Sequence, residues 1–155
     1  MRELVNKLIE KKITIATMES CTGGGVSNAI TNIEGASEIL KYSAVTYSNE
    51  YKIKMGVNPD VIEQYSVYSS ECADEMSKNI SVFAGSNLGV GITGKLNRVD
   101  VNNPYGDDNV VFVSVYDSRD KKYYNDVVEA VLGSRKENKE LVINKVIEIV
   151  ESIIK

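Results

Sequence analysis

The sequence predicts an α/β fold in which helices cover both faces of a largely parallel β-sheet. Segments with apolar residues at helical spacing alternate with short β-branched runs along the chain, an alternation typical of this class. A glycine-rich segment, residues 20–25, joins the first such run to a helical pattern, as strand-to-helix turns do. Residues 117–121 (DSRDK) separate two later runs and predict a hairpin, which adds one antiparallel strand.

Length and composition predict one globular domain over residues 1–155. The chain is 43% hydrophobic and 26% charged, and a chain of this size buries about two thirds of its unfolded surface. No apolar run reaches the roughly 20 residues of a membrane span, and the N-terminus lacks a signal-peptide core, so we expect a cytoplasmic protein without a membrane partner. The net charge of −4 disfavours nucleic-acid binding through a basic face.

The first half of the chain supplies two strands and the turn between them. Residues 1–12 form a predicted amphipathic helix, and the β-branched run 13–17 forms the first strand. The next helix begins after the glycines, with Thr22 as a candidate N-cap, and ends near Gly35, which suits a left-handed C-cap. Residues 39–48 indicate a second, buried strand.

Four helices and three strands account for the remainder. The predicted helices are 49–56 (with Asn49 as a candidate N-cap), 58–65 and 69–85, and a final helix runs from 134 to the C-terminus. The predicted strands are 87–93, 110–116 and 123–132, with a polar loop over 94–109. Gly89 and Gly91 inside the first of these strands favour close packing of another backbone against it.

The absence of histidine restricts the chemistry more than any other feature of the composition. A Ser-His-Asp triad, a Cys-His dyad and the commonest zinc sites cannot be built from this chain alone. A hydrolase with a protein nucleophile would need a lysine, a carboxylate or a tyrosine as its base. We expect no metal and no cofactor. Cys21 and Cys72 pair only if the fold brings them together, and a reducing compartment favours free thiols.

Four loops are predicted to converge at the carboxyl ends of the strands, where open α/β sheets bind ligands. They are residues 19–25, 47–52, the segment from 93 onward, and 133–135. Without histidine, Ser20 and Lys52 are the natural nucleophile and base. Such a lysine must be neutral near pH 7, which desolvation or a nearby cation such as Arg135 promotes. Glu19 is expected to hold the turn through backbone N–H groups.

The motifs of these loops resemble a known family. Residues 19–24 (ESCTGG), residues 45–50 (VTYSNE) followed by Lys52, and then Thr93-Gly94 are similar to the CinA C-terminal domain, the nicotinamide mononucleotide deamidase family. The resemblance covers nearly the whole chain. It implies a three-layer α/β/α fold and hydrolysis of the carboxamide of nicotinamide mononucleotide, which yields nicotinic acid mononucleotide and ammonia.

The resemblance also implies roles for individual residues. Ser20 would be the acyl-accepting nucleophile, Lys52 its base, and Tyr47 an aid to proton transfer. Substrate-binding residues would be Thr22, Gly23, Gly24, Thr93, Gly94 and Arg135, with Arg135 near the phosphate. The partners implied are a small nucleotide substrate and further copies of this chain in a homo-oligomer.

Residues 93–100 (TGKLNRVD) depart from the glycine- and proline-rich loop of that family. Lys95 and Arg98 are candidates to supply positive charge in place of main-chain amides. The alternative function is therefore a nucleotide-binding or self-associating domain without turnover. The residues also have ordinary structural interpretations: Ser20 as a helix cap, Cys21 as a buried apolar group, and Lys52 and Arg135 as solvated charges.

Overall fold

Five strands form one sheet in the order β2-β1-β3-β4-β5. The structure is a computed structural model that describes residues 1–97, 101–102 and 107–155. The strands are β1 (Ile15–Glu19), β2 (Leu40–Val45), β3 (Leu88–Gly94), β4 (Val110–Asp117) and β5 (Lys122–Glu129). β1 pairs in parallel with β2 and β3, whereas β4 is antiparallel to both β3 and β5. β4 therefore runs opposite to the other four strands, which confirms the predicted mixed, mostly parallel sheet.

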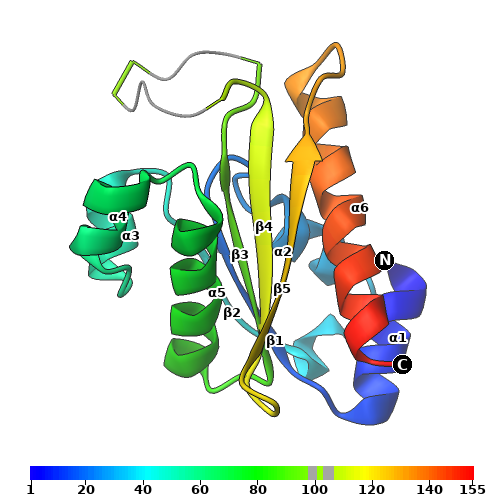
Figure 1. Ribbon diagram of the computed structural model, residues 1–155. Helices are drawn as coiled ribbons and strands as arrows, with labels where there is room; N and C mark the ends of the chain where they lie inside the picture. The colour runs from blue at the N-terminus through cyan, green and yellow to red at the C-terminus, as the bar shows by residue number, and fades with distance from the viewer. Residues whose placement is uncertain (98–100, 103–106) are drawn as a thin grey trace.

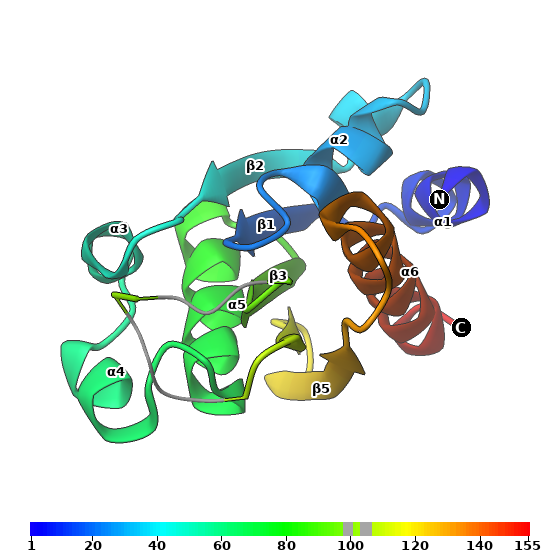
Figure 2. The ribbon, with the colours of Figure 1, turned by 90° about the horizontal axis from the view of Figure 1, so that it is seen from above.

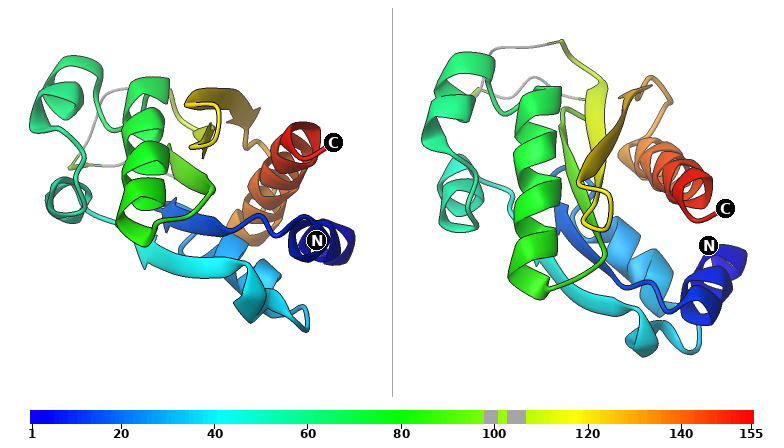
Figure 3. Two further views of the ribbon diagram at one scale, coloured as in Figure 1. Left: turned by 90° about the horizontal axis from the view of Figure 1, so that it is seen from below. Right: turned by 60° about the horizontal axis from the view of Figure 1, so that its bottom comes forward.

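Helices cover both faces of this sheet and make three layers (Figure 1). One layer holds α3, α4 and α5, and the other holds α1, α2 and α6. Their bounds are α1 (Arg2–Lys11), α2 (Gly25–Thr31), α3 (Asn49–Lys54), α4 (Pro59–Tyr65), α5 (Ser70–Ala84) and α6 (Arg135–Ile153), with a short 3-10 helix at Ala36–Glu38. Figure 3, seen from below, shows α1 alongside the C-terminal part of α6. The three-layer α/β/α architecture is thus confirmed.

The two faces of the sheet are packed differently. On the α6 face, aliphatic side chains of α1, α2, α6 and the strands form one large buried cluster, which includes Leu8, Ile30 and Val146. On the α5 face the helix backbone lies directly on β3. A Cβ at Gly89 would lie 2.0 Å from the Ser77 carbonyl oxygen. The close packing predicted from the strand glycines is therefore present.

Several predicted boundaries are wrong by a few residues. α2 ends at Thr31 rather than near Gly35, and Gly35, with φ 86°, instead precedes the 3-10 helix. The apolar Ile33 continued the helical spacing, but the chain has already left the helix there. The N-cap of α3 is Ser48, whose hydroxyl accepts from the Tyr51 N–H, and not Asn49. That helix also ends at Lys54 rather than at Gly56, with Met55 as its C-cap.

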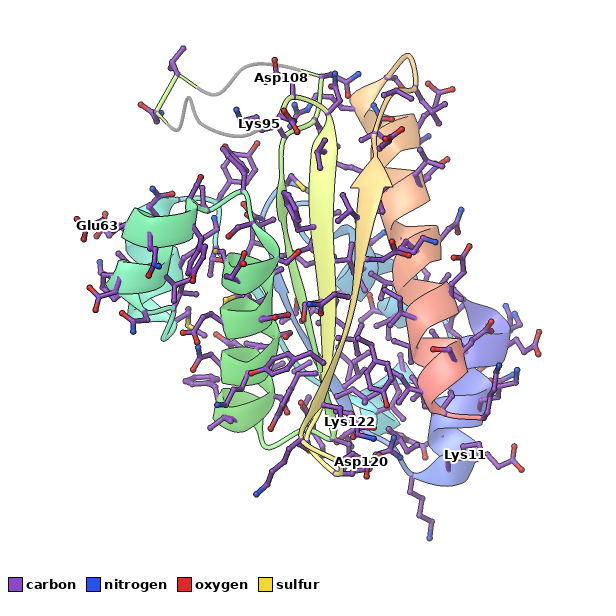
Figure 4. The ribbon with its side chains drawn as sticks, in the orientation of Figure 1. Lys11, Glu63, Lys95, Asp108, Asp120 and Lys122 are labelled. Atoms are coloured by element: carbon purple, nitrogen blue, oxygen red, sulfur yellow. The ribbon has the colours of Figure 1, made fainter. Side chains whose placement is uncertain are left out.

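The carboxyl ends of β1, β2, β3 and β5 meet at one edge of the sheet, seen from above in Figure 2. The four loops predicted to converge there all begin at these ends. The hairpin turn between β4 and β5 lies at the opposite edge, so Asp120 and Lys122 are far from Lys95 and Asp108 in Figure 4. Among the described residues, no helix is both long and apolar enough to cross a membrane.

Candidate active site

Ser20 is held at the carboxyl end of β1, next to β3. The strand before it is buried throughout, from Ile15 to Glu19. The Ser20 N–H donates to the Ile92 carbonyl at 3.0 Å, which continues the β1–β3 ladder by one residue. The side chain itself is only 8% exposed. Ser20 therefore has a fixed backbone at the ligand-binding edge of the sheet.

The Glu19 carboxylate organises the turn that follows. It is fully buried and accepts from the backbone N–H groups of Val26 and Ser27, both at 3.0 Å. These groups belong to the first turn of α2, where N–H groups lack helical partners. Glu19 also accepts from the Thr22 hydroxyl at 2.6 Å. The predicted structural role of Glu19 is confirmed, whereas the predicted N-cap at Thr22 is wrong, since Gly24 occupies that position.

The glycine turn leaves donors available above Ser20. Gly23 and Gly24 have φ values of 60° and 89°, which side-chain-bearing residues rarely adopt. The Gly23 N–H donates to the Ser20 carbonyl. Within residues 1–97, 101–102 and 107–155, the N–H groups of Thr22 and Gly24 donate no backbone hydrogen bond. They are thus the candidates for stabilising negative charge at this turn.

Lys52 on α3 reaches the Ser20 hydroxyl. Its side chain is buried, with the residue 2% exposed, and its Nζ donates to Ser20 Oγ at 3.1 Å. The same Nζ donates to the Thr46 carbonyl at 2.7 Å. The Thr46 N–H in turn donates to the Glu19 carbonyl at 2.8 Å. Two segments 32 residues apart in the chain therefore bring a hydroxyl and an amine together at the end of β1.

Tyr47 and Arg135 lie together at the rim. The Arg135 Nη2 is 3.4 Å from the Tyr47 hydroxyl, and its Nη1 donates to the Leu96 carbonyl. Tyr47 is 65% exposed. Arg135 is the first residue of α6, which Ser134 caps by accepting from the Glu137 N–H. The structure thus joins the loops after β2, β3 and β5 through one guanidinium group.

Thr93 and Gly94 form the end of β3 next to the site. Thr93 is 1% exposed, and its hydroxyl donates to the Val67 carbonyl at 2.7 Å. A Cβ at Gly94 would lie 2.5 Å from the Val110 carbonyl oxygen, so this position has no room for a side chain. Both residues fix the end of β3 against its neighbours. The substrate-binding roles that the resemblance implies for Thr93 and Gly94 stay predictions.

Lys95, one of the candidates for positive charge, is buried just after β3, near Asp108 (Figure 4). Its Nζ lies 3.6 Å from the Asp108 carboxylate and 4.8 Å from the centre of the Tyr68 ring. Arg98, the other candidate, lies outside the described residues. Lys95 therefore connects Asp108, which precedes β4, with Tyr68 in the connection between α4 and α5.

The two cysteines are free and buried. Burial raises the pKa of the Cys21 thiol to about 12. Burial likewise raises the pKa of Cys72 to about 12. Since the thiolate is the nucleophilic form, Cys21 is a poor nucleophile at neutral pH despite its position beside Ser20.

The profile of the CinA C-terminal domain family matches residues 1–154 of this chain. The chain belongs to the CinA C-terminal domain family. Similar relatives are named as putative competence-damage inducible proteins. That of Clostridium acetobutylicum is 53% identical over 88 residues, which are 56% of this chain and 21% of the relative. That of Clostridium perfringens is 46% identical over 96 residues, which are 61% of this chain and 23% of the relative. The matched region is thus under a quarter of those relatives.

Solved structures of the CinA superfamily share the fold. The protein from Enterobacter cloacae superposes with a TM-score of 0.88 at 21% identity, over 99% of this chain and 92% of its own. The competence or damage-inducible protein from Enterobacter asburiae gives 0.89 at 21% identity, over 99% and 97%. At this identity the likeness establishes the architecture alone.

One cation of this CinA domain was missed by the sequence analysis. Lys139 lies one helical turn after Arg135 on α6, and its Nζ is 3.6 Å from where a Cβ at Gly23 would lie. Residues four apart share a helix face, so Arg135 and Lys139 both belong to the side of α6 that meets the glycine turn. That spacing was the available signal, but it does not show which face of the helix is turned inward.

Proposed function

We propose that this domain hydrolyses the carboxamide of nicotinamide mononucleotide to nicotinic acid mononucleotide and ammonia. The observation that carries the proposal is the buried contact of 3.1 Å between Ser20 Oγ and Lys52 Nζ. In a chain without histidine, this pair joins a nucleophile to a base within hydrogen-bonding distance. Membership of the CinA family is consistent with this reaction.

The proposed reaction proceeds through an ester on Ser20. The neutral amine of Lys52 takes the proton of the Ser20 hydroxyl as Oγ bonds to the carboxamide carbon. The resulting ammonium then gives that proton to the departing nitrogen, so that the C–N bond breaks and ammonia leaves. Water next attacks the ester with Lys52 again as the base, which releases the acid and restores Ser20. Burial disfavours a charged amine, which supports Lys52 in the role of base.

Negative charge develops on the carbonyl oxygen during both attacks. The N–H groups of Thr22 and Gly24 are the donors that the glycine turn leaves available for it. In hydrolases, a donor of this kind typically contributes about 3 kcal/mol to the transition state. The turn is rigid because Glu19 holds both Thr22 and the first turn of α2.

The charges at the mouth of the site suit an anionic substrate. Arg135 and Lys139 on α6 flank the glycine turn, although the whole chain carries a net charge of −4. Local positive charge on an acidic protein favours recruitment of an anion such as a phosphate. We therefore place the phosphate of the nucleotide beside Arg135 and Lys139.

Ammonia release from nicotinamide mononucleotide by the purified protein tests the proposal. Ser20→Ala and Lys52→Met are expected to abolish release. Lys54→Met on the same helix, where the lysine is exposed and paired with Glu50, should leave it unchanged. A pure, folded wild-type protein without turnover would refute the proposed reaction. If the nucleotide then raised Tm without forming product, the domain would bind nucleotides only.

A further inference from the structure

A buried asparagine on α6 holds the connection between β5 and that helix. Asn138 is 0% exposed, and its Oδ1 accepts from the Leu132 N–H at 2.9 Å. Its Nδ2 donates to Asn97 Oδ1 at 2.7 Å and to the Leu132 carbonyl at 3.2 Å. Both amide N–H groups and the amide oxygen are therefore paired, as burial of a polar side chain requires. Through these bonds Asn138 joins the segment after β5 to the segment after β3.

Two further asparagine contacts fix the peptide group to which Arg135 binds. The Asn97 N–H donates to Asn109 Oδ1 at 2.8 Å, and Asn97 Nδ2 donates to the Leu132 carbonyl at 3.2 Å. The carbonyl of the same peptide group belongs to Leu96, and it accepts from Arg135 Nη1. Because a peptide group is planar, the bond from the Asn97 N–H to Asn109 sets the direction of the Leu96 carbonyl.

The same contacts hold the other end of the Arg135 side chain. Arg135 and Asn138 are three residues apart on α6 and share a face of that helix. Asn138 ties the start of the helix to Leu132, three residues before Arg135. The helix that carries the guanidinium and the carbonyl that the guanidinium binds are therefore both anchored to the contact between Asn97 and Asn138.

We propose that Asn138 is a positioning residue, which acts through Asn97 and holds the Arg135 guanidinium in place to bind the phosphate of the substrate. Among the described residues, contacts with Leu96 and Tyr47 use two of the five N–H groups of this guanidinium. Its other N–H groups suit a phosphate, which accepts paired hydrogen bonds from arginine. The inference rests on the proposed function and concerns recognition of the phosphate rather than the hydrolysis itself.

Asn97→Gly removes the contact while keeping the backbone conformation. Asn97 is exposed and has φ 58°, a left-handed conformation that glycine adopts freely. We expect KM for nicotinamide mononucleotide to rise about three- to tenfold with kcat unchanged, because a guanidinium that is not held loses part of its charge-assisted bond to the phosphate. KM for the nucleoside, which has no phosphate, should stay within about twofold of wild type. Lys121→Gly, at φ 55° in the hairpin at the opposite edge, is the matched control and should change neither KM.

A double-mutant cycle shows whether the network acts through Arg135. Arg135→Gln alone should raise KM for the nucleotide about tenfold or more. Adding Asn97→Gly to it should raise KM no further, because the group that Asn97 positions is already absent. Asn138→Leu should raise KM as Asn97→Gly does and also lower Tm by roughly 5 °C or more, since it leaves the Leu132 N–H without its acceptor. Additive effects on KM, or equal rises for nucleotide and nucleoside, would overturn the inference.

NMR signals of the Arg135 guanidinium test the positioning without a substrate. In the wild type, hydrogen bonds from both Nη groups slow rotation of the guanidinium, so these groups should give separate signals. The signals should merge in Asn97→Gly and stay separate in Lys121→Gly. Merged signals in the wild type, or separate signals in Asn97→Gly, would overturn the inference.

Binding measurements keep the two proposals apart. If wild-type protein binds the nucleotide without turnover, the proposed reaction fails, and Kd from calorimetry replaces KM in the same comparisons. If wild-type protein neither binds nor turns over the nucleotide, both proposals fail.

Discussion

Two lysines are buried at the same edge of the sheet, and they are held by different groups. Lys52 is 2% exposed and Lys95 is 3% exposed. The Nζ of Lys52 contacts a serine hydroxyl and a carbonyl oxygen. The Nζ of Lys95 lies beside the Asp108 carboxylate and over the Tyr68 ring.

The difference shows that the neighbours of a buried lysine say more about its role than burial does. A carboxylate and an aromatic face are groups that hold a cation in place. A hydroxyl can instead give up a proton to an amine. On this basis we expect Lys95 to be a structural anchor between Asp108 and Tyr68, and Lys52 to act as the base. The predictions below test that distinction, from the largest expected effect to the smallest.

Replacing each lysine with methionine tests the distinction directly. Lys52→Met should lower kcat for the nucleotide by roughly 10³- to 10⁴-fold, because the proton of Ser20 then has no acceptor. Lys95→Met should change kcat by less than about threefold, because the Lys95 amine contacts Asp108 and Tyr68 and not Ser20. Steady-state kinetics and circular dichroism on both variants provide the measurement. Equal losses of activity in the two folded variants would contradict the comparison.

Cys21 offers a second test, since it is the other nucleophile near Lys52. With its pKa raised by burial from 9.0 to about 12, the thiolate fraction at pH 8 falls about a thousandfold. Iodoacetamide should therefore modify Cys21 only after unfolding, and Cys21→Ala should retain turnover. Mass spectrometry of the native and the urea-unfolded protein provides the measurement. Rapid labelling of native Cys21 at pH 8 would show that the thiol is the activated group.

The same thiol contributes to pH-dependent stability. The unfolded thiol ionises near 9.0, whereas the folded one stays protonated up to about 12. The unfolded chain therefore binds fewer protons in this range, and the free energy of unfolding should fall as the pH rises from 9 towards 12. Cys21→Ala should reduce the slope of that fall in urea titrations.

Much of this arrangement follows from local sequence rules. The strand and helix types, the single antiparallel strand and the convergence of four loops follow from periodicity, glycines and chain order. The proximity of Ser20 to Lys52 was also expected, and the structure shows it, while their catalytic roles stay predictions. The end of α2 was not predictable, because Ile33 keeps a helical spacing that tertiary packing overrides. The buried Thr46 hydroxyl forms no hydrogen bond within the described part of the chain, which packing decides and no local pattern reports.

The rigidity of the glycine turn that follows Ser20 depends on Glu19. Glu19→Gln places an amide N–H₂ where the carboxylate accepts from Val26 and Ser27, and it removes a charge from the start of α2. The expected loss is about 2 to 3 kcal/mol in the free energy of unfolding, measured with urea. Glu34→Gln, at an exposed position, is the matched control and should change stability by less than about 0.5 kcal/mol. Equal effects would indicate that the cap contributes little.

The smallest expected effect concerns which cation contacts the phosphate of the substrate. If α6 rather than Lys95 contacts the phosphate, Lys139→Gln should raise KM for the nucleotide by about three- to tenfold with kcat unchanged. The exposed neighbour Lys136→Gln is the control. The nucleoside without the phosphate should be turned over equally by wild type and Lys139→Gln. A KM change for the nucleoside as well would assign Lys139 to the fold of the turn instead.

The hairpin of β4 and β5 decides where the last helix starts. β4 leads the chain away from Ser20, and its eight residues span roughly 26 Å, while β5 brings the chain back before Arg135 begins α6. The count of strands after β3 must therefore be even. A redesigned or diverged chain could gain or lose a whole hairpin here and still place its Arg135 side chain beside Tyr47. A change of one strand would leave α6 starting at the wrong edge, whatever the quality of its core.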